Sequence, residues 1–215
     1  MFTLMKNKIY TLLLLIILAS CSGSKSLTNQ SFSKEQTQLI SSADSLVPMR
    51  VFKITNKKDS LLLRSKSAYV KPSPNNVVLK TFVNRLYATV RDSISVGVGI
   101  AAPQVGILKN IIWVQRFDKE NHPFEVYLNP RITKYSTEKQ SVKEGCLSIP
   151  NRSDMLNSRS FLIEIEYDTM NAEHKNETIS DFTAVIFQHE IDHLSGILYL
   201  DHLEKEIRDA KKNKL

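Results

Sequence analysis

Hydrophobic residues recur at helical spacing between residues 76 and 92. Five of them, Leu79, Phe82, Val83, Leu86 and Val90, fall on one face of a helix drawn through this stretch. Spacings of three and four residues place side chains on the same side of an α-helix. The pattern therefore predicts an amphipathic helix over residues 76–92 whose apolar face packs against a core.

A second helical pattern runs from residue 182 to residue 193. Phe182, Val185 and Ile186 begin a stripe at positions i, i+3 and i+4, and His189 and His193 continue it at i+7 and i+11. Ser180-Asp181 is a favourable start for this helix, and Gly196 is a favourable end. The two histidines are therefore expected on the face that points toward the core.

Three short stretches are typical of β-strands. Residues 110–115 and 124–128 are rich in apolar and β-branched side chains, and the second stretch ends at Asn129-Pro130. Residues 160–168 alternate apolar and acidic side chains, as a strand with one buried face does. Short strands that are separate from the helices favour an α+β fold over a parallel α/β fold.

The first twenty residues indicate export. Lys6 and Lys8 precede an apolar run over residues 9–19, which is too short to span a bilayer but suits a signal peptide. The run ends in Leu18-Ala19-Ser20-Cys21, which resembles a bacterial lipoprotein signal in which Cys21 is acylated. We therefore expect residues 1–20 to be a signal peptide and the protein to be anchored by lipid, such as palmitate, to a membrane of the cell envelope. An ordinary signal peptide or a membrane anchor with an incidental cysteine is the alternative.

Composition divides the remainder of the chain. Residues 21–46 are rich in Ser, Thr, Gln and Lys, which predicts a polar tether with a short helix near residues 36–46. Apolar content rises at Val47-Pro48, so we expect one catalytic domain over residues 47–205. Residues 206–215 are expected to form a basic C-terminal tail.

The net charge of +7 does not indicate nucleic-acid binding. Lys6 and Lys8 lie in the expected signal peptide, which contains no acidic residue, so removing it leaves +5. The other basic residues are scattered along the chain rather than gathered into one patch. We therefore expect no nucleic-acid partner.

The second helix carries the sequence His189-Glu190-Ile191-Asp192-His193. Two histidines at i and i+4 can reach one metal ion, and a glutamate between them can contact a metal-coordinated water. Two histidines and a glutamate on a buried face are costly without a partner, and metal coordination would remove that cost. In one protease class the third ligand is a histidine at the position that Tyr199 occupies here, so the third ligand must come from elsewhere.

Cys146 is one candidate for that third ligand. It lies in Glu144–Pro150, a turn followed by an extended segment, and the only other cysteine is Cys21. A thiolate is a good ligand for zinc or ferrous iron. A small buried hydrophobic residue is the more usual role of a single cysteine. The residues alone leave these two roles equally open.

A third segment, Gly97–Gln104, contains closely spaced glycines followed by Ala101-Ala102-Pro103-Gln104. The glycines lack the spacing of a dinucleotide-binding loop. They suit either a tight turn or a close approach of the backbone to a ligand, with the Gln104 amide as a hydrogen-bond donor.

Together, these three segments resemble the bacterial peptide deformylase family, which is marked by GxGxAAPQ, EGCLS and HExDH in that order. They occur here as Gly97–Gln104, Glu144–Ser148 and His189–His193. The resemblance spans about residues 47–203 and implies an α+β fold, with short antiparallel sheets around a central HExDH helix. Asn151–Arg159 departs from the family's usual pattern, in which only Arg159 has a plausible match.

The resemblance also implies a role for each residue of the site. Cys146, His189 and His193 would hold the metal, Glu190 would be the general acid and base, and Gln104 with the Leu147 N–H would stabilise the oxyanion. The peptide would be bound by Val98, Gly99, Val142, Glu144, Gly145, Val185 and Ile186.

The implied reaction is the removal of the N-formyl group from N-formylmethionyl peptides, with release of formate, by attack of a metal-bound hydroxide. One divalent metal ion is expected, either Fe²⁺ or Zn²⁺, and the chain is expected to be a monomer. Two alternatives remain at this point. The chain could be an HExxH metallopeptidase or amidase that acts on an envelope substrate, or a metal-binding lipoprotein without catalytic activity.

Overall fold

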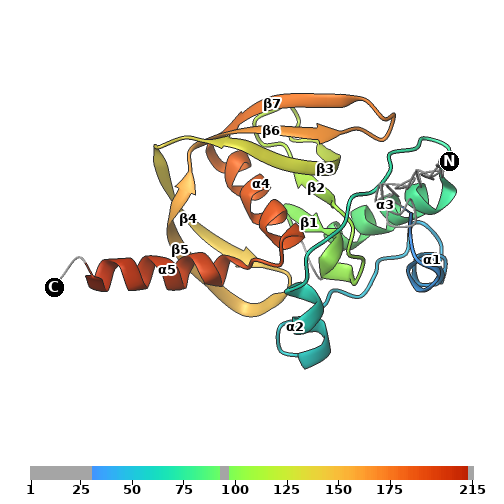
Figure 1. The fold of residues 1–215 in the computed structure, drawn as a ribbon, viewed down its shortest axis with the longest axis horizontal. Helices are drawn as coiled ribbons and strands as arrows, with labels where there is room; N and C mark the ends of the chain where they lie inside the picture. Colours follow the sequence, from blue (N-terminus) through green and yellow to red (C-terminus); the bar gives the residue numbers. More distant parts are fainter. Residues whose placement is uncertain (1–30, 93–96, 213–215) are drawn as a thin grey trace, which may run out of the picture.

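A central antiparallel sheet forms the body of the protein. The computed structural model describes residues 31–92 and 97–212. The sheet has the strand order β1-β2-β3-β6-β7, and a separate two-stranded sheet pairs β4 with β5 (Figure 1). The strands are β1 (Gly99–Ala101), β2 (Ile111–Gln115), β3 (Phe124–Tyr135), β4 (Lys139–Cys146), β5 (Ile149–Ser160), β6 (Leu162–Asp168) and β7 (His174–Ser180).

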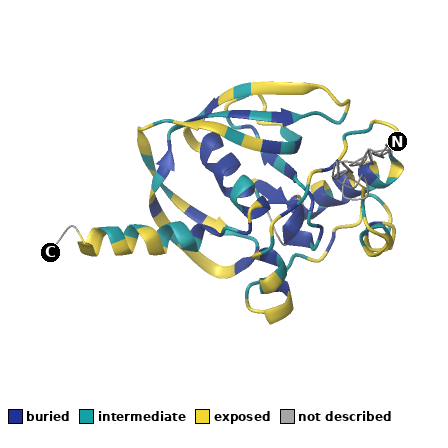
Figure 2. Ribbon diagram, viewed as in Figure 1, coloured by how far each residue is buried: buried dark blue, intermediate teal, exposed yellow. Residues whose placement is uncertain are grey.

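The helix that carries the two histidines is α4 (Asp181–Leu194), with Ser180 as its N-cap. It packs against the central sheet and against both strands of the β4–β5 hairpin. Figure 2 shows α4 as a largely buried helix inside the molecule. The chain leaves α4 through Gly196, whose φ of 73° suits glycine and whose Cα faces the Arg64 carbonyl too closely for a side chain. The expected helix and its end are both confirmed.

The helix expected over residues 76–92 is α3 (Val77–Val90), capped by Asn76. Leu79, Phe82 and Leu86 on its apolar face are fully buried. They belong to a core cluster that includes Ile100 and Ile111 from the first two strands. The prediction of a helix packed on the core is confirmed. The short η2 turn (Ala102–Val105) directly follows β1 along the chain.

The observed sheets are larger than the sequence pattern predicts. Strand β3 does not end at Asn129-Pro130: Asn129 adopts a φ of 51°, the register shifts there, and the strand continues to pair with β6. This is a β-bulge that redirects the strand rather than ending it. Strands β4, β5 and β7 were not predicted because they are mostly polar and lack the alternation that marks a half-buried strand.

The N-terminal boundary expected at residue 47 lies too late. Helix α1 (Lys34–Ile40) precedes it, and Ile40 is fully buried against α3. The Arg85 guanidinium donates hydrogen bonds to the carbonyls of Leu39, Ile40 and Val47. Part of the expected tether is therefore folded onto the domain, followed by α2 (Lys57–Leu63). The expected signal peptide and Cys21 lie outside the described residues.

The expected basic tail that starts at residue 206 also needs correction, because most of it is helical. Residues 199–212 form the helix α5 (Tyr199–Lys212), which projects from the body beside β5 (Figure 1). The Glu206 carboxylate accepts hydrogen bonds from the backbone N–H groups of Asn157 and Ser158 on β5. Only Tyr199 is buried along α5, but Leu200, Leu203 and Ile207 recur at helical spacing, so the sequence does carry a pattern for this helix.

None of the helices within residues 31–92 and 97–212 combines the length and the apolar composition needed to cross a membrane.

Candidate active site

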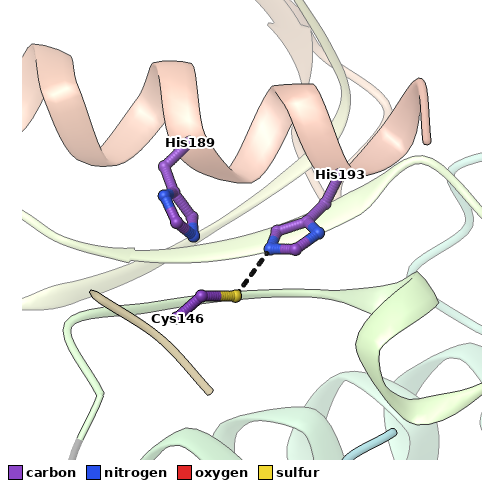
Figure 3. Close-up of side chains that lie close together, drawn as sticks. All are labelled: Cys146, His189 and His193. Carbon is purple, nitrogen blue, oxygen red and sulfur yellow. Dashed lines mark hydrogen bonds between the residues drawn. The ribbon is translucent and has the colours of Figure 1, made fainter. Parts of the chain in front are cut away.

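The structure brings Cys146, His189 and His193 together. One potential ligand atom from each residue lies within 4.8 Å of the others. Both histidines project from α4 toward the thiol at the end of β4, and His193 Nε2 lies 3.3 Å from Cys146 Sγ (Figure 3). One thiolate and two imidazoles form a donor set that suits Zn²⁺ or Fe²⁺. Of the two roles open for Cys146, the geometry supports that of a ligand.

The ring of His189 is oriented by Glu144. His189 Nδ1 lies 2.7 Å from Glu144 Oε2, which leaves Nε2 directed toward the thiol side of the ring. Glu144 in turn accepts two hydrogen bonds from the Arg159 guanidinium, at 2.6 and 3.0 Å. Carboxylates behind ligand histidines fix the ring orientation and the tautomer. Burial tends to raise the pKa of Glu144, but His189 and Arg159 together lower it to about 2.

Arg159 links this carboxylate to a second one. Its Nη1 donates to Asp192 Oδ2 at 2.6 Å, and the same oxygen lies 2.8 Å from His202 Nε2. A hydrogen-bonded chain thus runs from His202 through Asp192, Arg159 and Glu144 to His189. His202, the next histidine after the His189–His193 motif, therefore lies behind the site and is not one of its three clustered ligands.

Cys146 is poised to be a thiolate. Burial tends to raise the pKa of its thiol, but His193 and His189 more than offset this and hold the pKa well below its usual value. The same pairing keeps the pKa of His189 above its usual value, although burial opposes it. Ser148 N–H also donates toward Cys146 Sγ at 3.4 Å. A thiolate is the form of cysteine that binds metals.

Glu190 lies inside the site without a polar partner. Within the described part of the chain, its Oε2 is buried and accepts no hydrogen bond. Burial raises the pKa of Glu190 to about 7. A carboxylate with a pKa near neutrality can both accept and donate a proton under ordinary conditions. A buried carboxylate that has no hydrogen-bond partner and lies beside a set of metal ligands is suited to exchange a proton with a reactant bound there.

Gln104 is fixed with its amide NH₂ toward the site. Its Oε1 accepts the Ala101 N–H at 2.8 Å, and its Nε2 lies 3.3 Å from Ser148 Oγ and 3.6 Å from Cys146 Sγ. The backbone hydrogen bond determines which end of the amide faces the thiol. Gln104 is therefore a preoriented donor next to the ligand cluster.

A cleft of about 510 Å³ opens over these residues. Its apolar lining comes from Val98, from Phe182, Val185 and Ile186 on α4, and from Leu147, Ile149 and Pro150 at the hairpin. Most residues expected to bind the peptide do line it: Val98, Gly99, Glu144, Gly145, Val185 and Ile186. Val142 does not line it: the lining on β4 begins at Lys143, and Val142 pairs with Leu156 one position further from Cys146.

Sequence reasoning missed several residues that line the cleft, among them Lys53, Arg152 and Phe182. Lys53 reaches it from the segment before α2, Arg152 from β5, and Phe182 from the first turn of α4. Lys53 donates a hydrogen bond from Nζ to the Leu147 carbonyl, 94 positions further along the chain. No motif could have indicated this contact, since only the fold brings the two segments together.

The fold and site define a metallohydrolase in which two histidines from one helix and a cysteine from a hairpin surround a cleft. The sequence profile of the polypeptide deformylase family matches residues 51–209. The chain belongs to this family.

Relatives of known name agree. The peptide deformylase of a Wolbachia strain from Drosophila simulans is 40% identical over 139 residues, which cover 60% of this chain and 76% of the relative. That of Desulforudis audaxviator is 36% identical over 155 residues, covering 71% and 94%.

Solved structures show the same fold. A class I type b peptide deformylase from Acinetobacter baumannii superposes with a TM-score of 0.64 at 32% identity, covering 72% of this chain and 99% of that one. The enzyme from Thermotoga maritima gives a TM-score of 0.62 at 29% identity, covering 72% and 97%. The expected α+β peptide deformylase fold is confirmed.

Proposed function

We propose that this protein removes the N-formyl group from N-formylmethionyl peptides and releases formate. The observation that carries the proposal is that Cys146 and His189 of the Cys146–His189–His193 cluster line one cleft together with Glu190 and Gln104. Membership of the family supports it. A solved Acinetobacter baumannii peptide deformylase has Met-Ala-Ser bound, a peptide that begins with methionine.

Cys146, His189 and His193 would hold the single divalent ion, Fe²⁺ or Zn²⁺. When bound, such an ion acts as a Lewis acid and lowers the pKa of a coordinated water. A carboxylate oxygen of Glu190 accepts a proton from the attacking water. Glu190 then donates this proton to the nitrogen of the leaving amine. Gln104 Nε2 and the Leu147 N–H donate to the oxygen on which negative charge develops.

The cleft also positions the peptide. The segments around Gly99 and around residues 146–148 offer backbone groups to an extended peptide, in the manner of an added strand. Val98, Val185 and Ile186 form an apolar region of the cleft that suits a methionine side chain. These contacts would keep the formyl carbon near Glu190 and within reach of the attacking water.

The test is formate release from formyl-Met-Ala-Ser by the full-length chain in detergent, with the metal content measured on the same sample. Glu190→Gln keeps the side-chain shape and removes the proton acceptor. We expect normal metal content and a reduction in turnover of about 10²–10⁴-fold. Unchanged turnover would contradict the assigned role of Glu190. Loss of metal from this variant would make Glu190 a ligand or a structural residue instead.

We further propose that the enzyme is anchored by lipid in the cell envelope, where formylated peptides or the N-termini of exported proteins would be its substrates. The support is the sequence alone: Lys6 and Lys8, the apolar run over residues 9–19, and the small residues before Cys21. Stable anchoring needs more than one acyl chain or a second signal, which a lipoprotein N-terminus supplies.

Cys21→Ala tests this anchor. Cells that express the wild type and the variant are fed labelled palmitate and then fractionated. The wild type should carry label and sediment with membranes, whereas Cys21→Ala should carry no label. A labelled variant would refute acylation at Cys21. Cys146→Ala serves as the matched cysteine control and should still be labelled.

A further inference from the structure

The charged side chains at the mouth of the cleft are all cationic. Lys53, Lys143 and Arg152 line it, and Lys143 and Arg152 are exposed to solvent. The acidic residues that line the same cleft are Glu144 and Glu190, and each is at most 5% exposed. We refer to Lys53, Lys143 and Arg152 as the cationic rim.

The acidic groups of the cleft do not neutralise this rim. Both oxygens of Glu144 are engaged by Arg159, and one of them also contacts His189. Glu190 lies at the reacting centre. Asp154, which does not line the cleft, pairs with Arg152 at 2.8 and 3.4 Å, so the uncompensated charges of the rim are those of Lys53 and Lys143. Lys53 and Lys143 form no ion pair with another of the residues that the structure describes.

The rim is held in place at the site. The Lys53 ammonium donates to the carbonyl of Leu147, the residue whose N–H faces the reacting group in the proposed mechanism. The Lys53 backbone N–H is bound by Asp59, and the next residue, Ile54, donates to the Ser148 carbonyl. One positive charge of the rim is therefore fixed against the 146–148 segment rather than free in solvent.

The position of the rim determines which part of a substrate it meets. The formyl group lies at the metal ligands, and the methionine side chain enters the apolar region formed by Val98, Val185 and Ile186. The residues after methionine must leave along the remaining lining, which carries the three cations. A formylated N-terminus has no charge of its own, so the downstream residues supply the charge that the rim encounters.

We propose that the cationic rim makes this enzyme prefer formyl peptides that carry a carboxylate within the few residues after methionine. This inference rests on the proposed deformylase function and names its substrate class. The carboxylate can be an acidic side chain or the free C-terminus of a short peptide, since both present the same group. Exposed pairs of opposite charge contribute little each, so we expect about 1.5- to 5-fold in kcat/KM per matched charge.

The experiment measures kcat/KM of the full-length chain in detergent with three C-terminally amidated peptides, formyl-Met-Ala-Glu-Ser, formyl-Met-Ala-Gln-Ser and formyl-Met-Ala-Lys-Ser. We expect the order Glu, Gln, Lys at low salt, with the differences shrinking as salt screens the charges. Formyl-Met-Ala-Ser as the free acid, compared with its amide, tests the second source of the carboxylate.

Lys143→Glu should lower or invert the Glu-to-Lys ratio. Lys80→Glu on α3 makes the same change in total charge on an exposed residue that does not line the cleft, so it should leave the ratio as in the wild type. Equal kcat/KM for all peptides, with or without the substitutions, would contradict the proposed preference for a carboxylate. No hydrolysis of any formyl peptide would instead overturn the proposed function, so the two failures are distinguishable.

Discussion

The Glu190 side chain lies close to the backbone of β1, and this close approach explains why residue 99 is a glycine. A Cβ built on Gly99 would lie 2.5 Å from Glu190 Oε1 and 2.8 Å from Ile186 Cγ2. The position can therefore hold no side chain unless the catalytic carboxylate moves. Gly99 is needed here because α4 and β1 approach each other closely around the reacting group, and not because of its backbone conformation.

Gly99→Ala should therefore damage activity more than its size suggests. We expect Glu190 to be displaced, turnover to fall by at least about tenfold, and stability to fall by about 1–3 kcal/mol, as for an overpacked site. Turnover is measured with formyl-Met-Ala-Ser, and stability by urea denaturation. Gly145→Ala is the matched control for stability, since its Cβ would meet nothing closer than 3.8 Å. Equal stability loss in both variants would contradict this account.

At the scale of elements, the β4–β5 hairpin completes a site that α4 cannot form alone. The hairpin supplies Cys146, and it supplies both Glu144 and Arg159, which lie behind the ligand His189. Arg159 is 3% exposed and its charge is matched by Glu144 and Asp192. Buried ion pairs of this kind hold a geometry more than they add stability.

The sequence predicts α4 well and the hairpin poorly, for one physical reason. Helix α4 is buried from Thr183 to Glu190, so its apolar positions reveal the element, although Phe182 at the start of the expected buried stripe is exposed. Strands β4 and β5 pair mainly with each other, and half of their residues are exposed to solvent. Hydrophobic periodicity arises where one face of an element is buried. It therefore does not reveal a strand that forms by pairing with its neighbour and buries little. The three site motifs were found because they depend on chemistry at short spacing.

Helix α2 anchors the segment that carries Lys53. Asp59 accepts two hydrogen bonds from the Arg50 guanidinium, at 2.7 and 2.9 Å, and one from the Lys53 N–H at 3.1 Å. These hydrogen bonds, with that of Arg50 the largest, lower the pKa of Asp59, although burial opposes them. The Asp59 carboxylate on α2 therefore helps to position Lys53, one member of the cationic rim.

Asp59→Asn should destabilise the protein more at neutral pH than in acid. The pKa of Asp59 is lower in the folded protein than its unfolded value near 3.9, so its ionised form contributes stability above that value. This contribution is lost as the pH falls below about 4 toward the folded pKa. We expect a loss of about 1 kcal/mol at pH 7, discounted because Arg50 is 63% exposed. Urea denaturation of both proteins at pH 7 and pH 3.5 measures it, and an equal difference at both values would refute the assignment.

At the scale of the whole molecule, the N-terminal segment outside the family match is part of the body. Phe32 packs edge-on against Phe82 of α3 with ring centroids 5.8 Å apart, and the family profile begins only at residue 51. If Cys21 is acylated as proposed, the ten residues between it and Phe32 can span at most about 35 Å. The docking of α1 would then set how far from the membrane the enzyme works.

Arg85 holds this segment to the body. It is 4% exposed, and it donates to the carbonyls of Leu39, Ile40 and Val47 from a helix in which it is the buried cation. Arg85→Met keeps much of the side-chain volume and removes all of these donors. The carbonyls at the end of α1 would then lie buried without partners, which costs about 1–3 kcal/mol for each such group.

We therefore expect Arg85→Met to release the N-terminal segment while leaving the site intact. The free energy of unfolding should fall by about 2–4 kcal/mol, and brief proteolysis should cleave the variant between residues 31 and 50 while the wild type resists. Metal content and turnover of formyl-Met-Ala-Ser should stay near the wild-type values, since α1 contributes no residue to the cleft. Lys80→Arg, on the exposed face of the same helix, is the control. Loss of metal in Arg85→Met would mean that the segment supports the active site and not only its attachment.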